Sequence, residues 1–150
     1  MNVAAKKTST QDYFDVTLED AKPFKASVTG LRSSISPNRG RTWVVEATEK
    51  DSDEKRLRVF LIVFSQTLSN GSHPVGEDKQ GFVTIELVDY TDPQDLTSQL
   101  AESGNIDFQL DVAGSHFSGD FNAKIEKKEV KTVSTVADGK FDTLLTSTNR

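Results

Sequence analysis

Two histidines, His73 and His116, are the first residues to consider for chemistry, because histidine changes charge most readily near neutral pH. A histidine that acts as a general base needs an orienting carboxylate and a nucleophile close to it in space. The surrounding sequence does not point to such an arrangement, since each histidine lies in or beside a turn-rich segment. We therefore expect two surface histidines. A hydrolase that uses His116 with Asp or Ser neighbours is the weakest of three functional hypotheses.

Metal sites have little support in the sequence. The chain has no cysteine, which excludes disulfides, thiolate zinc sites and cysteine nucleophiles, and two isolated histidines do not make a transition-metal site. Carboxylates cluster twice, at Asp51, Asp53 and Glu54 and at Asp89, Asp92 and Asp95. Neither cluster has the spacing of an EF-hand calcium loop, and helix capping explains the second better. The sequence predicts no catalytic residue, no metal ligand and no cofactor, so we do not expect an enzyme.

The charge of the chain also narrows the partners. Net charge is −5 at pH 7, with a pI near 5.0, so the broad basic surface that binds a phosphate backbone is not expected. Three arginines near one loop, Arg32, Arg39 and Arg41, are interpreted as a solvated turn. No run approaches the ~20 apolar residues of a membrane span. The start carries no apolar stretch after its charges, which predicts a cytoplasmic protein, or an extracytoplasmic one whose signal has been removed.

Alternation of apolar and polar residues dominates the chain and predicts β-strands that position these side chains. It begins near Tyr13, where Phe14, Val16 and Leu18 share one face. We expect a disordered leader at 1–11, a single β domain at 12–146 and a frayed tail at 147–150. One segment, 93–102, has the signals of a short helix, with Asp92 as N-cap and Pro93 at the first helical position. The predicted fold class is all-β, an antiparallel β-sandwich or open barrel with one short helix.

Two hairpins can be given a register from the apolar pattern. Across Gly114-Ser115 as a two-residue turn, the predicted pairs are Val112 with Phe117, Leu110 with Gly119, Phe108 with Phe121 and Ile106 with Ala123. Between 41–48 and 56–63, the predicted pairs are Ala47 with Leu57, Val45 with Val59 and Trp43 with Leu61. Both registers collect apolar side chains on one face, which is how a buried face selects register.

The segment 57–64 departs from alternation, because both of its faces are apolar. One face carries Phe60, Ile62 and Phe64. A central strand covered by the short helix or by a crossing loop would explain this. The functional alternative is an exposed apolar strip, which soluble monomers rarely leave bare. Our first hypothesis is therefore a non-catalytic binding or structural module that uses these three residues as a protein–protein interface, with a homodimer as one form.

The second hypothesis is a small-ligand or carbohydrate-binding β-sandwich. Such sites combine aromatic platforms with a few polar groups in a concave surface. Trp43 is the single tryptophan and the one candidate platform of note, although the register above buries it against Leu61.

The chain also resembles small bacterial β-sandwich domains of unassigned function. The resemblance is carried by PFKA at 23–26, Trp43, the turn SNGS at 69–72 and the strand FSGDF at 117–121, and it covers about residues 23–126. Such domains are often found outside the cytoplasm. The resemblance implies no activity, and the chain lacks the signal or lipoprotein cysteine that usually accompanies the pattern.

Overall fold

The structure, a computed structural model, describes residues 12–127 and 133–147 of the 150-residue chain. Within these residues every regular element is a β-strand and none is a helix. The strands are β1 (Tyr13–Leu18), β2 (Phe24–Lys25), β3 (Val28–Ser36), β4 (Gly40–Lys50), β5 (Arg56–Ser65), β6 (Gly71–Pro74), β7 (Thr84–Asp89), β8 (Thr97–Asp111), β9 (His116–Glu126), β10 (Ser134–Leu144) and β11 (Thr146–Ser147). The prediction of an all-β fold is confirmed.

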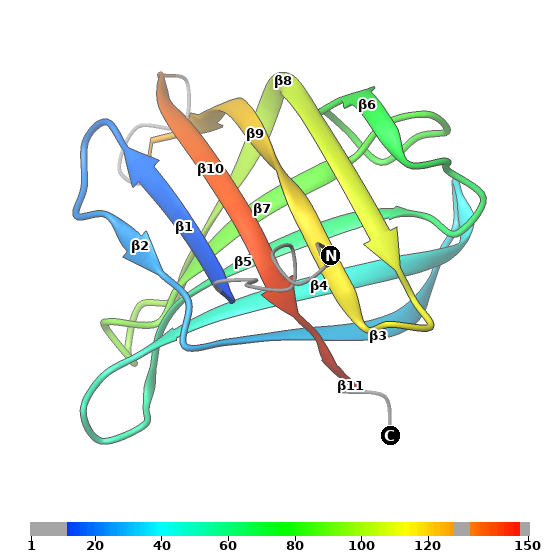
Figure 1. Ribbon diagram of the computed structural model, residues 1–150. Helices are drawn as coiled ribbons and strands as arrows, with labels where there is room; N and C mark the ends of the chain where they lie inside the picture. The colour runs from blue at the N-terminus through cyan, green and yellow to red at the C-terminus, as the bar shows by residue number, and fades with distance from the viewer. Residues whose placement is uncertain (1–11, 128–132, 148–150) are drawn as a thin grey trace, which may run out of the picture.

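The strands belong to one sheet rather than to two stacked sheets. Their order is β11-β3-β4-β5-β7-β8-β9-β10-β1-β2, with β6 paired to β8. Neighbouring strands are antiparallel except β11, which runs parallel to β3. The sheet curls into a half-barrel in which β3, β4 and β5 cross behind β8, β9 and β10 in Figure 1. This shape is nearer to the open-barrel alternative than to the sandwich.

Contacts between the two ends of the sheet narrow the opening of the half-barrel. The N–H of Ser27, just after β2, donates to the carbonyl of Thr48 on β4 at 2.6 Å. Near the other end, the buried hydroxyl of Thr143 donates to Thr29 Oγ1 at 3.1 Å. The half-barrel is therefore drawn together by single hydrogen bonds and by the short β11, not by a full strand pair.

Phenylalanine fills the interior. Eight of the nine Phe side chains are at most 3% exposed: Phe14, Phe24, Phe60, Phe64, Phe108, Phe117, Phe121 and Phe141. Phe14, Phe141 and Phe117 stack in sequence, with ring centroids 5.1 and 4.5 Å apart. Each buried ring contributes on the order of 1.5–3 kcal/mol through removal of apolar surface from water. Because these rings occupy the middle, hollows lie at the margins of the half-barrel: at its two ends and, with about 420 Å³, between the 76–82 segment and strands β7 and β8.

The β8–β9 hairpin exists and has the predicted faces, but its register differs by two residues. Phe108 lies opposite Gly119 and Ile106 opposite Phe121. The loop is 112–115 and not the two residues Gly114-Ser115, because the Asp111 carboxylate accepts the N–H of Gly114 at 2.9 Å. A shift of two residues preserves which side chains face inward, so the inward row was predicted correctly except for Val112, which lies in the loop and is 48% exposed.

The β4–β5 register differs by three residues, and this changes the face of β5. Ala47 lies opposite Phe60 instead of Leu57, and Trp43 lies opposite Phe64 instead of Leu61. The cause is a tighter loop than predicted: the Asp51 N–H donates to the Lys55 carbonyl at 2.9 Å, and a bulge follows Glu49. An odd shift exchanges the two faces of a strand.

The predicted helix at 93–102 is absent, and most of it belongs to β8. Gln99 and Ala101 face the interior and Leu100 faces out, so alternation prevails over the helix-start signals. Asp92 does act locally, because its carboxylate accepts the N–H of Gln94 at 2.9 Å, but it closes a turn. A window this short gains too little from a cap to outweigh pairing with β7 and β9.

The predicted domain limits can be tested only in part. The leader at 1–11 and residues 148–150 of the tail lie outside the described residues. Ser147, which was assigned to the frayed tail, pairs with Leu31 in β11. The described strands form a single sheet around one core.

Candidate functional site

The half-barrel has two ends, and each carries a hollow. The Arg58 end is formed where β4, β7, β9 and β1 finish and where β5, β8 and β10 begin. The Trp43 end lies at the opposite ends of the same strands, beside the β8–β9 loop. The two ends have hollows of similar size but differ in what their polar groups do.

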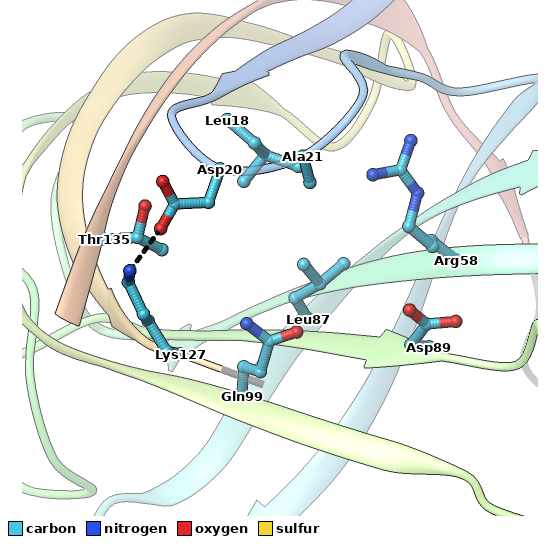
Figure 2. Close-up of a pocket in the computed structure, with 9 residues that line it drawn as sticks. All are labelled: Leu18, Asp20, Ala21, Arg58, Leu87, Asp89, Gln99, Lys127 and Thr135. Carbon is cyan, nitrogen blue, oxygen red and sulfur yellow. Dashed lines mark ion pairs between the residues drawn. The ribbon is translucent and has the colours of Figure 1, made fainter. Parts of the chain in front are cut away.

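The hollow at the Arg58 end has a volume of about 260 Å³ and a mixed lining (Figure 2). Its lining residues are Leu18, Asp20, Ala21, Arg58, Leu87, Asp89, Gln99, Lys127 and Thr135. Figure 2 shows Lys127 reaching towards Asp20 on one side, with Arg58 on the other side above Asp89. Two cations and two carboxylates in one hollow would suit a polar ligand only if they were available to it.

Arg58 is already engaged by its own chain. Its Nε and Nη2 donate to the two oxygens of Glu49 at 2.7 and 2.9 Å, and its side chain is only 11% exposed. The same guanidinium donates to the carbonyls of Lys22 and Pro23 at 3.0 and 2.9 Å. This residue ties β4 and β5 to the β1–β2 loop, and a bidentate pair of this kind is among the strong side-chain interactions.

The other polar groups at the Arg58 end are paired as well. Lys127 Nζ lies 2.9 Å from Asp20 Oδ2, and its hydrogen bond is the main cause that lowers the pKa of Asp20, with a smaller contribution from Thr135. Gln99, which is buried, donates from Nε2 to the Glu126 carbonyl at 2.8 Å. Asp89 accepts from the backbone and hydroxyl of Thr91 at 2.9 and 2.6 Å. These groups are engaged within the chain, which leaves them little capacity for a ligand.

The Trp43 end has two adjoining hollows, with Trp43 and Val112 lining both. The first, of about 240 Å³, is lined by Trp43, Phe64, Gln66, Leu68, Asn70, Phe108, Leu110 and Val112. The second, of about 230 Å³, is lined by Leu31, Arg32, Trp43, Val112, Ser115, Leu145, Thr146 and Ser147. Trp43 is half-buried, packs against the core and borders both hollows.

Several polar atoms at the Trp43 end are not used by the fold. Gln66 donates to the Thr42 carbonyl through Nε2, and Asn70 accepts the Leu110 N–H through Oδ1. Within residues 12–127 and 133–147, no hydrogen bond engages the Trp43 indole N–H, the Gln66 amide oxygen or the Asn70 amide nitrogen. In each amide, one group is held by the fold and the other is available: the oxygen of Gln66 and the nitrogen of Asn70 have no hydrogen bond to the described residues. The arrangement offers an aromatic surface with preoriented polar groups beside it.

The predicted interface residues do not lie on the surface. Phe60, Ile62 and Phe64 are at most 1% exposed and belong to the core, so the proposed strip is not formed by them. The register shift described above is the reason, since it turns this face of β5 inward. Leu57, Leu61 and Val63 are instead the partly exposed apolar residues on the outer face of β5.

The histidines and carboxylate clusters have local partners. His116 Nε2 lies 2.5 Å from Asp142 Oδ1, and His73 Nε2 lies 2.6 Å from the Ser69 carbonyl. Asp51 accepts backbone N–H groups of its own loop at 2.8 and 3.0 Å. Among the described residues, no group of three or more His, Asp or Glu side chains is arranged to hold a metal ion. No helix in that part of the chain is long and apolar enough to cross a membrane.

The three arginines near the β3–β4 loop have separate roles. Arg39 is buried, with Nε 2.7 Å from Asp78 Oδ1 and Nη1 donating to the carbonyls of Val63 and Phe82 at 3.1 Å each. The hydrogen bond from Ser36 is the main cause that lowers the pKa of Asp78, and Arg39 and Asn38 contribute less. Arg41 is exposed, and Arg32 lines one hollow at the Trp43 end. The prediction of one solvated turn is therefore wrong for Arg39.

Sequence reasoning singled out Trp43 but missed Gln66 and Asn70. Gln66 follows β5 and has no motif around it, and Asn70, just before β6, was interpreted only as part of the SNGS turn. The β5–β6 connection, which crosses beside the start of β4, brings both residues to the hollow that Trp43 lines. Comparison of the chain with protein-family models, with curated proteins and with solved structures finds no match.

Proposed function

We propose that this protein is a non-catalytic binding module that takes a small polar ligand of the carbohydrate class at the Trp43 end. The observation that carries the proposal is Trp43 itself, half-buried between two hollows with the amides of Gln66 and Asn70 beside it. The C–H faces of a sugar ring are apolar and its edge carries hydroxyls. An aromatic face with amide groups at its margin matches both parts of such a ring.

The affinity expected from this site is modest. Each hollow is smaller than the ~300 Å³ at which pockets for drug-sized ligands begin, so each suits one sugar ring rather than a large ligand. One aromatic surface and a few hydrogen bonds must offset the loss of translational and rotational freedom on binding. We therefore expect dissociation constants of about 0.1–1 mM, or roughly −4 to −5.5 kcal/mol.

The single tryptophan makes the test direct. We expect a panel of neutral and acidic oligosaccharides to contain at least one that changes the emission of Trp43 saturably. By calorimetry, Trp43→Ala should weaken that sugar by tenfold or more, while Trp43→Phe should keep part of the affinity. Leu96→Ala serves as the matched control, because Leu96 is 57% exposed and lies in the loop before β8, at the opposite end. A folded wild-type protein whose emission no sugar alters would contradict the proposal.

A second candidate function is self-association through the outer face of β5. Leu61 and Val63 lie there, with Val63 opposite the buried Val44 of β4; across β7 the row passes Glu86 before it reaches the exposed Leu100 of β8. We propose a second copy of the chain as the partner, because two faces of branched aliphatic side chains on antiparallel sheets can stack on each other. Light scattering at micromolar concentration tests this: a dimer that Leu61→Glu converts to monomer supports it, and a wild-type monomer rejects it.

A further inference from the structure

Two amide side chains in the hollow of about 240 Å³ at the Trp43 end have orientations that the fold determines. Gln66 donates from Nε2 to the carbonyl of Thr42 at 3.1 Å. Asn70 accepts the N–H of Leu110 on Oδ1 at 2.9 Å. Because a backbone carbonyl only accepts and a backbone N–H only donates, these contacts show which end of each amide is oxygen and which is nitrogen. The oxygen of Gln66, an acceptor, and the nitrogen of Asn70, a donor, are therefore the atoms left for a ligand.

A ligand can reach both of these atoms and the indole N–H of Trp43. In the part of the chain that the structure describes, no hydrogen bond engages any of the three. Asn70 is exposed, and neither the Gln66 oxygen nor the indole nitrogen is among the buried polar atoms that lack a partner. The remaining side chains of this lining are apolar: Phe64, Leu68, Phe108, Leu110 and Val112. The side chains of this hollow therefore offer one acceptor and two donors in an uncharged, largely apolar setting.

The connection that carries the two amides is held by the main chain. The N–H of Gln66 donates to the carbonyl of Arg41 at 2.9 Å, and the N–H of Leu68 donates to the carbonyl of Ser65 at 3.0 Å. The side chain of Gln66 is tied to β4 and that of Asn70 to β8, strands that are not neighbours in the sheet. Because both amides are already held in place, a ligand has little conformational freedom to remove from them.

A secondary amide complements this set of atoms. It has one N–H, which can donate to the Gln66 oxygen, and one carbonyl, which can accept from the Asn70 nitrogen. The N–H and the carbonyl of a trans amide point in opposite directions, which suits partners that are tied to different strands. An acetamido group also carries a methyl, for which Leu68 and Leu110 provide an apolar surface. Because no charged side chain lines this hollow, neither an anion nor a cation finds a counter-charge there.

We infer that the ligand is an uncharged N-acetylated amino sugar, with its acetamido group between Gln66 and Asn70 and its ring against Trp43. The inference rests on the proposed function and adds to it the class of sugar and its orientation. The indole N–H is left for a ring hydroxyl. A sugar with a hydroxyl in place of the acetamido group can use the same atoms, but it lacks the methyl and one of the two hydrogen bonds. The site therefore prefers the acetamido sugar without excluding the other.

The test compares sugars that differ only in the acetamido group. The probes are the methyl β-glycosides of N-acetylglucosamine and N-acetylgalactosamine, each paired with the methyl β-glycoside of glucose or of galactose. By calorimetry, we expect at least one acetamido sugar to bind about tenfold more tightly than its plain partner, which corresponds to about 1.4 kcal/mol.

Two variants test the role of the amides in this preference. Asn70→Asp keeps the acceptor for the Leu110 N–H but replaces the donor nitrogen with an oxygen, so it should reduce the preference to about twofold or less. Gln66→Ala removes the acceptor and should weaken the acetamido sugar by about fivefold. Asn105→Asp is the matched control, because it adds the same charge at an exposed position of β8 outside the hollow and should leave the preference unchanged.

The outcomes separate the two proposals. If neither acetamido sugar binds more tightly than its plain partner, or if Asn70→Asp leaves the preference intact, the inference fails while carbohydrate binding stands. The inference also fails if N-acetylglycine methylamide, which has secondary amides but no sugar ring, binds as tightly as the acetamido sugar. If no sugar of any kind changes the emission of Trp43, the proposed function fails with it.

Discussion

The Arg58 end and the Trp43 end of the half-barrel carry hollows of similar volume that differ in how their polar groups are engaged. At the Arg58 end, the charged and amide side chains form ion pairs and hydrogen bonds within the chain, from Arg58 with Glu49 to Lys127 with Asp20. At the Trp43 end, the indole and half of each flanking amide remain unengaged by the described residues. Volume does not separate these two ends, and charge alone would favour the Arg58 end, whereas the state of the hydrogen bonds supports the Trp43 end that we propose.

The polar side chains are engaged at one end and not at the other because different contacts close the two ends. At the Arg58 end the β1–β2 loop must be held against β4 and β5, and a buried guanidinium with four acceptors does so. At the Trp43 end the short β11 and the hydrogen bonds of Thr143 already connect β10 to β3. Side chains there are not needed for closure, and they are free to serve a ligand.

The largest expected effect on stability lies at the Arg58 end. Arg58→Met leaves the Glu49 carboxylate mostly buried and without its partner, so we expect a loss of about 3–5 kcal/mol in the free energy of unfolding. The double variant Arg58→Met with Glu49→Met should recover much of that loss, because no uncompensated charge remains. Urea denaturation measures both. If the single variant loses less than about 1 kcal/mol, the ion pair does not close this end.

Trp43→Ala should reduce sugar binding more than stability, the reverse of what we expect for Arg58→Met. The side chain is half-buried and packs at the margin of the core, so we expect a stability loss of about 2 kcal/mol, below that of a fully buried aromatic residue. Its effect on sugar binding should exceed tenfold, whereas Arg58→Met, measured where it is folded, should change binding by less than twofold. Equal effects of the two variants on binding would show that the ends are not separate in function.

Two glutamines, one at each end, allow the same comparison of stability and binding with smaller expected effects. Gln99 at the Arg58 end is buried and hydrogen-bonded to Glu126, and Gln66 at the Trp43 end is partly exposed. We expect Gln99→Ala to cost about 1–2 kcal/mol of stability and no affinity. Gln66→Ala should cost less than about 0.5 kcal/mol of stability but about fivefold in sugar affinity, as for one hydrogen bond. Calorimetry with the sugar, together with urea denaturation, distinguishes this result from equal effects.

The sequence predicted the strands well wherever alternation was uninterrupted, and the reason is physical. On β8 and β9 an inward row of Phe and Ile opposite a row of Asp and Asn can be satisfied in one way only, so the faces were correct although the register was two residues out. On β5 both rows are apolar, so the pattern did not indicate which face of the strand points into the core. The short loop closed by Asp51 then determined the register, and it moved Phe60, Ile62 and Phe64 into the core.

The same shift explains why the candidate site was only partly predicted. Trp43 was identified as the one possible platform, but the assumed register placed it against Leu61 in the core; opposite Phe64, near the start of β4, it lies at the end of the half-barrel. Gln66 and Asn70 reach it through a connection without a repeating pattern, and such contacts between segments follow from the closed fold rather than from local sequence. The prediction of a helix at 93–102 was wrong for a related reason, since pairing with β7 and β9 outweighed a local cap.

The smallest effect that the comparison predicts is a dependence on pH at the Arg58 end. Hydrogen bonding from Lys127 lowers the pKa of Asp20 below its ordinary value of 3.8 in the folded chain, so the carboxylate stabilises the fold at pH values above 3.8. This contribution is lost as pH falls through the lower, folded-state pKa. In Asp20→Asn, the stability difference from wild type should be constant near neutral pH and shrink below pH 3.8, and salt should reduce it because the pair is exposed. Urea denaturation between neutral and acidic pH measures it. A difference that grew as the pH fell would mean that Asp20 is held in its protonated form, and the Arg58 end would then not be closed by this ion pair.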